Sequence, residues 1–461
     1  MIKIFNTRSG KKEDFTPLKE GEIKMYLCGP TVYDTAHLGH GRSAVSFDII
    51  RKYFIYRGYK MTFVSNYTDI DDKMINRANE EGITVAELAS KIIPEYELDY
   101  GSLGIMPADI QPKATEHIDT MIDIVKKLED AGCTYVLDDG VYFDINKFPS
   151  YGKLSGQKLE ELQMGARVPV KESKKNPYDF ALWKLKKEGE PFWPSPWGDG
   201  RPGWHIECSA MSFAHLGETF DLHGGGLDLT FPHHECEVAQ SEAAFGENTF
   251  AKYWIHNGFI NVDNEKMSKS LGNFFTLKDI FKKYDPQIVR YMILQTHYRN
   301  PINFAPALLD QSKAALSRLH DFIRNLNNIT EEGDLNEEIK DVVKNSQENF
   351  EKSMDDDFDS SGALGAIFEL VKSVNILISG KKLNLTDAKH ILDYFEKIDE
   401  VFGVIFYKEE NIDSDIEKLI EERKEARKNK DFARADQIRD DLLKDGIVLD
   451  DTSQGTIWKK A

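Results

Sequence analysis

A run of seven residues, 231–237, reads FPHHECE and contains two histidines, two glutamates and a cysteine. Imidazole, thiolate and carboxylate groups are the side chains with which proteins bind zinc. If the run is helical, His233 shares a face with Glu237 four residues on and with Cys236 three residues on. His234 then lies roughly 100° around the helix, which places it outside the same small site. Chemistry alone leaves Cys236 and Glu237 as equal candidates.

Further ligands must come from elsewhere in the chain. Of the four cysteines, Cys28 ends an apolar strand-like run and Cys208 lies in PGWHIECSAM. The cysteines are far apart in a chain of 461 residues without a secretory signal, which argues against a disulfide framework. The alternative is that Cys28 and Cys236 only fill the core and that His233 caps a surface turn.

The segment HLGH, residues 37–40, suits phosphate binding. Gly39 lets the backbone approach a ligand closely, and the following helix would present its N-terminus to an anion. The side chains of His37 and His40 can donate hydrogen bonds to phosphate oxygens. GHGRSA also fits G-x-G-x-x-A, but a dinucleotide fingerprint begins directly after its strand, and here the glycine follows eleven residues later. The alternative is two loop histidines without a role.

The segment KMSKS, residues 266–270, carries Lys266 and Lys269 between small polar residues. Two ammonium groups on a flexible loop can close over a polyphosphate and neutralise developing charge. A lone K-x-x-K would more simply be a solvated loop.

Several periodic segments must position these residues. Residues 24–30 and 60–66 are expected strands, and residues 43–58 an expected helix with Phe47, Ile50 and Phe54 on one stripe. This β-α-β order predicts a parallel sheet. Strand-like runs return in ETFDLHGG and KYWIHNGFINV, and the pattern is helical from about residue 306.

The charge of the chain is uneven. Its formal net charge is −19, which by itself argues against a nucleic-acid partner. Residues 418–461 hold 11 basic and 10 acidic side chains, a net of +1, so the other 417 residues carry −20. A C-terminal pair of helices and a hairpin is expected there. Its candidates for RNA contact are Arg423, Arg427, Lys428, Lys430, Arg434 and Trp458.

HLGH followed by KMSKS on an α/β chain resembles the class I aminoacyl-tRNA synthetases. The segments YLCGPTVYD, TDIDDK, GWHIECSAM and HGGGLDLTFPHHE resemble one branch of that class, the cysteinyl-tRNA synthetase family. The likeness extends over essentially the whole chain, through MDDDFDSSGALGAIFEL and the final ARADQIRDDLLKDGIVLDDTSQGTIW.

The resemblance implies an α/β fold, with a Rossmann-like parallel-sheet catalytic core, an insertion, an all-α bundle and a small mixed C-terminal domain. We expect the core in residues 1–120 and 201–260, with a connective insertion at 121–200. Residues 261–305 would hold the KMSKS stem-contact region, 306–406 the helical bundle and 407–461 the anticodon-binding domain.

The resemblance also assigns site residues. The metal ligands for one zinc per chain would be Cys28, Cys208, His233 and Glu237, although at Cys236 the family more often has asparagine. Catalysis and ATP binding, with Mg²⁺ on the polyphosphate, would involve His37, Gly39, His40, Lys266 and Lys269. The amino acid would be bound by Gly29, Thr68, Trp204 and Asp228.

The implied reaction is ATP-dependent activation of L-cysteine and its transfer to tRNA(Cys). Zinc would distinguish cysteine from serine through the thiolate, because a pocket of shape alone rejects such an isostere only ~10²-fold. A closed structural zinc is the alternative. Rival functions are a cysteine:amino-sugar ligase of the same superfamily and a non-catalytic zinc- or RNA-binding paralogue. No membrane span and no secretory signal are expected, so we predict a cytoplasmic monomer.

Overall fold

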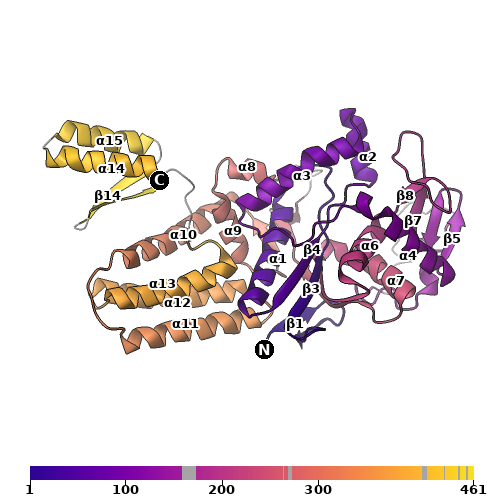
Figure 1. Ribbon diagram of the computed structural model, residues 1–461, viewed down its shortest axis with the longest axis horizontal. Helices are drawn as coiled ribbons and strands as arrows, with labels where there is room; N and C mark the ends of the chain where they lie inside the picture. Colours follow the sequence, from indigo (N-terminus) through magenta and orange to yellow (C-terminus); the bar gives the residue numbers. More distant parts are fainter. Residues whose placement is uncertain are drawn as a thin grey trace.

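A four-stranded parallel sheet forms the centre of the computed structural model (Figure 1), which describes residues 1–157, 173–262, 264–267, 273–406, 413–429, 431–444, 447–452 and 455–460. The strand order is β10-β9-β3-β4, and every neighbouring pair is parallel. The strands are β3 (Glu22–Leu27), β4 (Lys60–Ser65), β9 (Thr219–Gly226) and β10 (Phe250–Asn257). The expected parallel sheet is confirmed.

Helix α1 (Leu38–Tyr56) connects β3 to β4 and completes the first β-α-β unit. The stripe of Phe47, Ile50 and Phe54 is buried in the core, as its spacing predicts. The helix begins at Leu38, five residues earlier than expected, and His37 is its N-cap. The HLGH segment therefore forms the cap and first turn of α1 instead of a loop before it.

A second sheet stands beside the core, on the right in Figure 1. It is antiparallel, in the order β5-β6-β7-β8. Its strands are β5 (Thr134–Leu137), β6 (Gly140–Phe143), β7 (Phe180–Leu185) and β8 (Gly200–Pro202). Helices α4 (Ile118–Asp130), α6 (Trp204–Leu216) and α7 (Glu235–Phe245) pack between it and the parallel sheet. Two of these helices carry predicted metal ligands.

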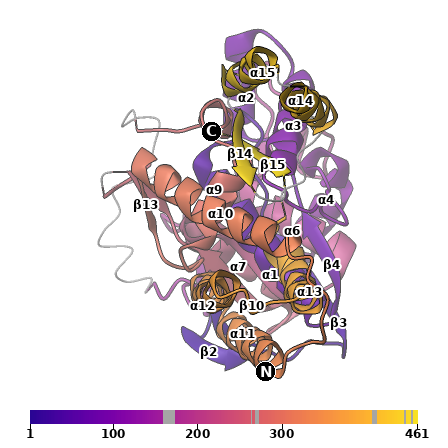
Figure 2. The same cartoon turned by 90° about the vertical axis from the view of Figure 1, so that its left-hand side faces the viewer.

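Four long helices form a bundle that packs against α1, away from the second sheet (Figure 1 and Figure 2). They are α10 (Pro306–Asn327), α11 (Glu337–Asp355), α12 (Ser360–Ser379) and α13 (Leu385–Phe402). Within the described residues, α12 is the one helix long and apolar enough to cross a membrane by length and composition. Its buried stripe, which includes Ile367 and Leu370, packs in the core of the bundle, chiefly against α11. The apolar composition of α12 is therefore explained by its place in the core of the bundle.

The last unit contains α14 (Asp413–Lys428), α15 (Phe432–Lys444) and a hairpin of β14 (Ile447–Thr452) and β15 (Gly455–Lys460). Two helices followed by a hairpin are what the sequence predicts. The remaining elements are β1 (Lys3–Asn6), β2 (Lys11–Asp14), α2 (Asp72–Glu81), α3 (Val85–Ser102), β11 (Ile260–Val262), β12 (Glu265–Lys266), α8 (Leu277–Phe281), α9 (Pro286–Leu294) and β13 (Ile302–Phe304).

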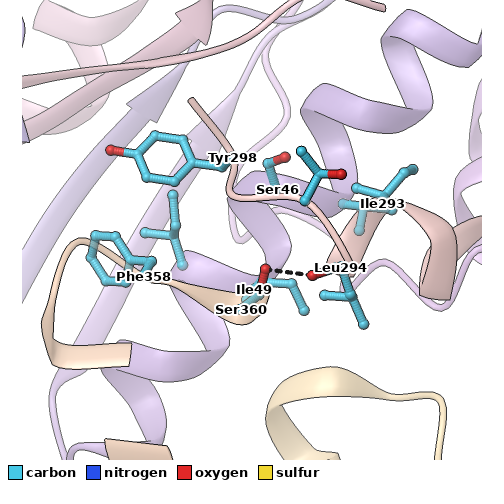
Figure 3. Close-up of a pocket in the computed structure, with 10 residues that line it drawn as sticks. Ser46, Ile49, Ile293, Leu294, Tyr298, Phe358 and Ser360 are labelled. Carbon is cyan, nitrogen blue, oxygen red and sulfur yellow. Dashed lines mark hydrogen bonds between the residues drawn. The ribbon is translucent and has the colours of Figure 1, made fainter. Parts of the chain in front are cut away.

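The junction of α1, α9 and the bundle is closely packed. Figure 3 shows a gap in it, lined by Ser46, Ile49, Ile293, Tyr298, Phe358 and others. The gap measures about 10 Å³, and the Ser360 hydroxyl beside it donates a hydrogen bond to the Leu294 carbonyl over 2.8 Å. Because a water molecule needs roughly 10–15 Å³, this space is too small for a ligand.

Candidate active site and metal centre

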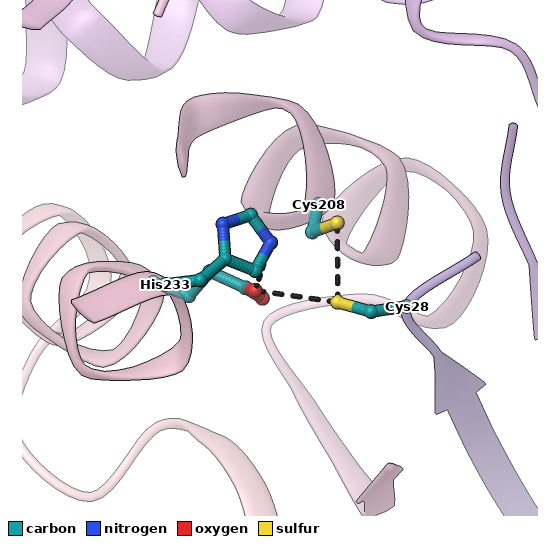
Figure 4. A group of neighbouring side chains, drawn as sticks. Cys28, Cys208 and His233 are labelled. Carbon is teal, nitrogen blue, oxygen red and sulfur yellow. Dashed lines mark hydrogen bonds and ion pairs between the residues drawn. The ribbon is translucent and has the colours of Figure 1, made fainter. Parts of the chain in front are cut away.

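Cys28, Cys208, His233 and Glu237 meet at one point, with one possible ligand atom of each within 4.8 Å of the others. The two sulfur atoms lie 3.3 Å apart, and the Cys28 sulfur lies 3.4 Å from Glu237 Oε1. His233 Nε2 lies 3.0 Å from the same oxygen. Figure 4 shows Cys28, Cys208 and His233 gathered around this point. Two thiols, an imidazole and a carboxylate on one centre are a donor set that suits zinc.

The fold explains why ligands from four segments converge. Cys28 directly follows β3, at the carboxyl edge of the parallel sheet, where open α/β sheets bind their ligands. Cys208 lies in the second turn of α6, and Glu237 in the first turn of α7. His233 belongs to the irregular turn Thr230–His234 that leads into α7. The Cys208, His233 and Glu237 side chains are buried, and Cys28 is half-buried.

Two further histidines hold the predicted ligands in place. His223 Nε2 lies 2.8 Å from Glu237 Oε2, the oxygen that turns away from the sulfur atoms. His205 Nδ1 lies 2.9 Å from His233 Nδ1, which leaves His233 Nε2 toward the centre. Such outer partners fix the orientation of metal ligands. Neither was predicted from the sequence; their only signal was their position in HGGGLDLTFPHHE and GWHIECSAM, two of the segments that carry the resemblance.

The electrostatics of the cluster favour charged donors. Burial raises the pKa of Glu237, but His223 and His233 outweigh it and hold that pKa well below its usual range. Burial likewise raises the pKa of the Cys208 thiol, yet the Cys28 thiol and His233 lower it to about 6. Burial raises the pKa of Cys28 well above its usual value. These shifts favour an ionised Glu237 carboxylate and a more acidic Cys208 thiol at the centre.

One detail of FPHHECE differs from the sequence expectation. His234 was expected to lie outside the small site, but it precedes Glu237 by three residues on helical backbone, and its Nε2 lies 3.9 Å from Glu237 Oε1. That nitrogen is buried and has no hydrogen-bond partner among the described residues, and His234 belongs to a second possible donor group with Cys28, His223 and Glu237. The expectation that an offset of 100° keeps His234 away from the site was wrong.

Cys236 points away from the donor cluster. Its buried sulfur lies 3.4 Å from the Tyr151 hydroxyl and packs in the core between α6, α7 and the second sheet. Neither group of possible ligands within the described residues includes Cys236. The structure therefore separates Glu237 and Cys236, which chemistry alone left equal.

The outer partner His223 gives a first prediction. His223→Asn is expected to weaken zinc binding by about 10–100-fold, because Glu237 loses the group that orients it. Competition with a chromophoric chelator measures the affinity. His215→Asn is the matched control, since His215 contacts His117 over 2.9 Å and is not part of the cluster. Equal affinities in the two variants would contradict the orienting role.

The HLGH histidines cap α1. The His37 side chain accepts a hydrogen bond from the His40 backbone, the His40 side chain accepts one from the His37 backbone, and the two rings stack at 3.6 Å. The Tyr96 hydroxyl lies 3.1 Å from His40 Nδ1. The reciprocal cap satisfies helix N–H groups and holds both imidazoles at the positive end of α1. An anion binding there would meet both rings.

The chain that follows KMSKS is hydrogen-bonded to the HLGH segment. The Leu38 N–H donates to the Phe275 carbonyl, the Leu277 N–H donates to the Ala36 carbonyl, and Phe274 contacts the His37 ring edge-on. The backbone of Lys266 pairs with Asn261, while its side chain and all of Lys269 lie outside the described residues. Two segments about 230 residues apart thus lie side by side, as a shared phosphate site requires.

Gly39 is required by the stacked histidines. A Cβ atom there would lie 2.9 Å from His37 Cε1 and 3.0 Å from His37 Nδ1. Gly39→Ala is therefore expected to displace the His37 ring and lower ATP-dependent activation about 10–100-fold, since misplacement of about 1 Å costs that much. Steady-state pyrophosphate exchange at varied ATP measures the loss. Gly365→Ala is the control, because a Cβ there meets open space; a similar loss in both would contradict the steric argument.

The residues predicted to bind the amino-acid substrate differ in how they are placed around the donor cluster. Gly29 donates its N–H to Asn66 Oδ1 over 2.9 Å, and Asn66 Nδ2 donates to the buried Thr68 hydroxyl over 3.3 Å. The Trp204 ring stacks on His233 with centroids 4.2 Å apart and is 38% exposed, so it covers the cluster from the solvent side. Asp228 follows β9 in a short 3₁₀ turn and lies against Gly226. Asn66, which links two of them, escaped the sequence analysis.

The C-terminal candidates for RNA contact are only partly on the surface. Arg423 is 5% exposed, so it cannot belong to a basic outer face as expected. Arg434 is paired with Glu422 over 2.7 Å. Arg427 and Lys428 are exposed. Lys430 and the side chain of Trp458 lie outside the described residues.

Comparison with known proteins agrees with this geometry. Residues 14–314 match the family described as tRNA synthetases class I (C) catalytic domain, 349–407 the DALR domain, and 409–458 the cysteinyl-tRNA ligase anticodon binding domain. A cysteine–tRNA ligase from Clostridioides difficile (strain 630) is 51% identical over 467 residues, covering 100% of both chains.

Solved structures share the fold. A methionyl-tRNA synthetase from Mycobacterium tuberculosis in complex with methionyl-adenylate superposes with a TM-score of 0.65 at 15% identity, over 83% of this chain and 92% of that chain. The LeuRS–tRNA–LeuAMS ternary complex from Agrobacterium radiobacter K84 gives 0.63 at 12% identity, over 85% of each chain. The predicted α/β core with its insertion and helical domains is confirmed.

Proposed function

This chain belongs to the cysteine–tRNA ligase family of class I tRNA synthetases, and from that premise we propose which of its residues perform each part of the reaction. It is an aminoacyl-tRNA synthetase whose substrates are an amino acid, ATP and tRNA, and it carries an anticodon-binding domain. The proposed finer assignment is L-cysteine and tRNA(Cys), in a cytoplasmic monomer with the domain limits given above.

The first step joins the cysteine carboxylate to the α-phosphate of ATP and releases pyrophosphate. His37 and His40, held at the N-terminus of α1, would donate hydrogen bonds to the phosphate oxygens. Lys266 and Lys269 would neutralise the leaving pyrophosphate, with Mg²⁺ bound to the polyphosphate. Gly39 leaves room for the His37 ring beside the phosphates, because any side chain at this position would clash with His37.

The second step transfers the cysteinyl group to the terminal adenosine of the tRNA. Its hydroxyl oxygen attacks the acyl carbon, and AMP leaves with the bonding electrons. Positioning is the main requirement, so the amino acid must stay fixed through both steps. We assign that task to Thr68 and Asp228 for the amino group, Gly29 for close approach and Trp204 as a cover over the cluster.

The convergence of Cys28, Cys208, His233 and Glu237 carries the proposal for substrate selection. These residues would hold one zinc ion, which when bound favours a thiolate over a hydroxyl. Trp204 stacks on His233 at the solvent side of the cluster, where it would cover the bound amino acid. Serine would lack the soft donor, so discrimination needs no separate editing site.

The two rival functions have less support. An amino-sugar ligase has no use for an anticodon module, whereas residues 409–458 match that domain. A non-catalytic paralogue has no need for the capped, stacked histidines of HLGH or for the segment after KMSKS hydrogen-bonded beside them. Both rivals predict that tRNA is not charged.

Cysteine-dependent ATP–pyrophosphate exchange, followed by charging of tRNA(Cys), tests the proposal. Exchange is expected with cysteine and not with serine, and it should disappear with the zinc and return on its addition while circular dichroism stays unchanged. Charging of an amino-sugar instead of tRNA would favour the rival ligase. Exchange unaffected by metal removal would refute the role of zinc, and unfolding on removal would indicate a structural zinc.

A further inference from the structure

A cavity of about 120 Å³ lies between α1, α3, the ends of β3 and β4, and the segment 105–111. Most of its walls are apolar or aromatic. The residues that define them are Leu27, Ala44, Phe63, Tyr67, Tyr100 and Met106. An engineered apolar cavity of similar size, 150 Å³, accommodates benzene, so this one has room for a single small ring.

The cavity and the metal cluster lie on opposite sides of the same strand ends. Leu27, Ser65 and Tyr67 line the cavity, and each immediately precedes a residue of the site, namely Cys28, Asn66 and Thr68. Successive side chains of extended backbone point to opposite faces. Occupancy of the cavity therefore does not compete with the amino acid for space.

The charged groups that line the cavity are mostly satisfied. Asp48 accepts hydrogen bonds from the Met106 N–H over 2.9 Å and from Arg290 over 2.6 Å. Arg51 donates through its Nη atoms to the carbonyls of Met106 and Pro107 and pairs with Asp109 over 2.8 Å. Asp48 and Arg51 therefore leave no unpaired charge in the cavity, and Glu97, the third charged residue of the lining, is exposed to solvent.

Two buried polar atoms of the lining residues can hydrogen-bond a ligand. Arg51 Nε is buried and has no hydrogen-bond partner among the described residues, and the buried Tyr67 hydroxyl lies beside the side chain of Gln111, which also lines the cavity. Tyr67 is 2% exposed and Arg51 4%. Buried polar groups normally have partners, and those without one are candidates for ligand contacts. Both are donors, and the tyrosine hydroxyl can also accept.

We propose that this cavity binds a small monocyclic phenol, with the ring against Phe63, Tyr67 and Tyr100 and the hydroxyl in a hydrogen bond with Tyr67 or Arg51. The aromatic walls favour a planar ring, and the buried donors favour a neutral oxygen over an ammonium group. The site is distinct from those of cysteine, ATP and tRNA, and it does not depend on their assignment.

Gly101 offers a way to block the cavity without breaking the fold. It lies in the last turn of α3 on the cavity lining, it is exposed, and a Cβ atom there would meet no atom within 4 Å. A phenylalanine can therefore extend into the open space. Gly365, in α12 of the bundle, is also helical and exposed with no atom within 4 Å of a Cβ, so Gly365→Phe is the matched control.

Saturation-transfer NMR with p-cresol on the full-length protein tests the proposal. A dissociation constant on the order of 1 mM is expected, as for other ligands of so few atoms. Binding should weaken at least about tenfold in Gly101→Phe, remain in Gly365→Phe, and persist when cysteine and a non-hydrolysable ATP analogue are saturating. Toluene, which lacks the hydroxyl, should bind at least about fivefold more weakly.

Three outcomes would overturn the inference. Unchanged binding to Gly101→Phe would place the p-cresol elsewhere. Displacement by cysteine and the ATP analogue would place it in the active site. Equal binding of toluene would show that the hydroxyl is not recognised and would exclude a phenol as the preferred ligand. A thermal transition in Gly101→Phe close to that of Gly365→Phe shows that a lost signal comes from the blocked cavity and not from unfolding.

Discussion

Cys208→Ser is expected to slow cysteine activation more than about 100-fold and to release the bound zinc. Loss of an outer-shell partner alone costs about 10–100-fold in metal affinity or activity, so loss of a proposed direct ligand costs more. The pKa of this thiol is lowered to about 6 by Cys28 and His233 despite its burial, so it is a thiolate at neutral pH, whereas a serine hydroxyl stays neutral. Pyrophosphate exchange and elemental analysis of zinc measure the two losses.

Cys236→Ser is the matched control for this variant. Cys236 is also buried, lies one residue before Glu237, and contacts Tyr151 instead of the cluster. It is expected to keep its zinc and most of its activity. If Cys236→Ser loses zinc as Cys208→Ser does, Cys236 is a ligand and the assignment to Glu237 fails. If Cys208→Ser keeps full zinc and activity, the proposed metal site itself is wrong.

The sequence predicted the parallel sheet, α1 and the C-terminal pair of helices, because periodicity follows directly from which face is buried. The start of α1 was misplaced by five residues. Helix ends depend on capping, and the cap here is made by two histidine side chains, His37 and His40, which are not typical capping residues. No local pattern indicates that pair as a helix start.

The members of the cluster could be named from the resemblance, but their arrangement could not be derived from spacing. His234 was placed wrongly because residues three apart on a helix also share a face, so an offset of 100° from His233 did not move it away from Glu237. The outer partners His205 and His223 come from other segments and meet the ligands only in the folded chain. Arg423 was misread for a similar reason, since burial of a basic helical residue depends on what packs against it.

A buried ion pair outside the proposed metal site gives the largest expected loss of stability. Asp48→Ala is expected to lower the free energy of unfolding by about 3–5 kcal/mol, the usual cost of leaving a buried charge without its partner. Asp48 and Arg290 are both fully enclosed and 2.6 Å apart, and Lys52 lies 2.8 Å from the same carboxylate. The fall in the urea midpoint, at an unchanged slope, measures the loss.

A second substitution at Asp48 separates the contribution of its charge to stability from that of its hydrogen bonds. Asp48→Asn can keep the hydrogen bond from the Met106 N–H but removes the charge, so it should fall between wild type and Asp48→Ala. Lys344→Ala removes an exposed pair with Glu348 and should cost less than about 1 kcal/mol. Equal losses for Asp48→Ala and Lys344→Ala would refute the role of burial.

Because of where the Asp48–Arg290 pair lies, its loss is expected to affect tRNA charging as well as stability. Arg290, in α9, also donates to the Phe402 carbonyl at the end of α13 and to the Leu103 carbonyl just after α3. Asp48 lies in α1, whose first turn holds the stacked histidines. Asp48→Ala is thus expected to loosen the bundle from the helix that carries the proposed phosphate site. At temperatures where the variant stays folded, we expect tRNA charging to fall more than pyrophosphate exchange, because only charging requires the helical domains and the core to hold one tRNA together. A proportional loss of both would show that the pair supports the core alone.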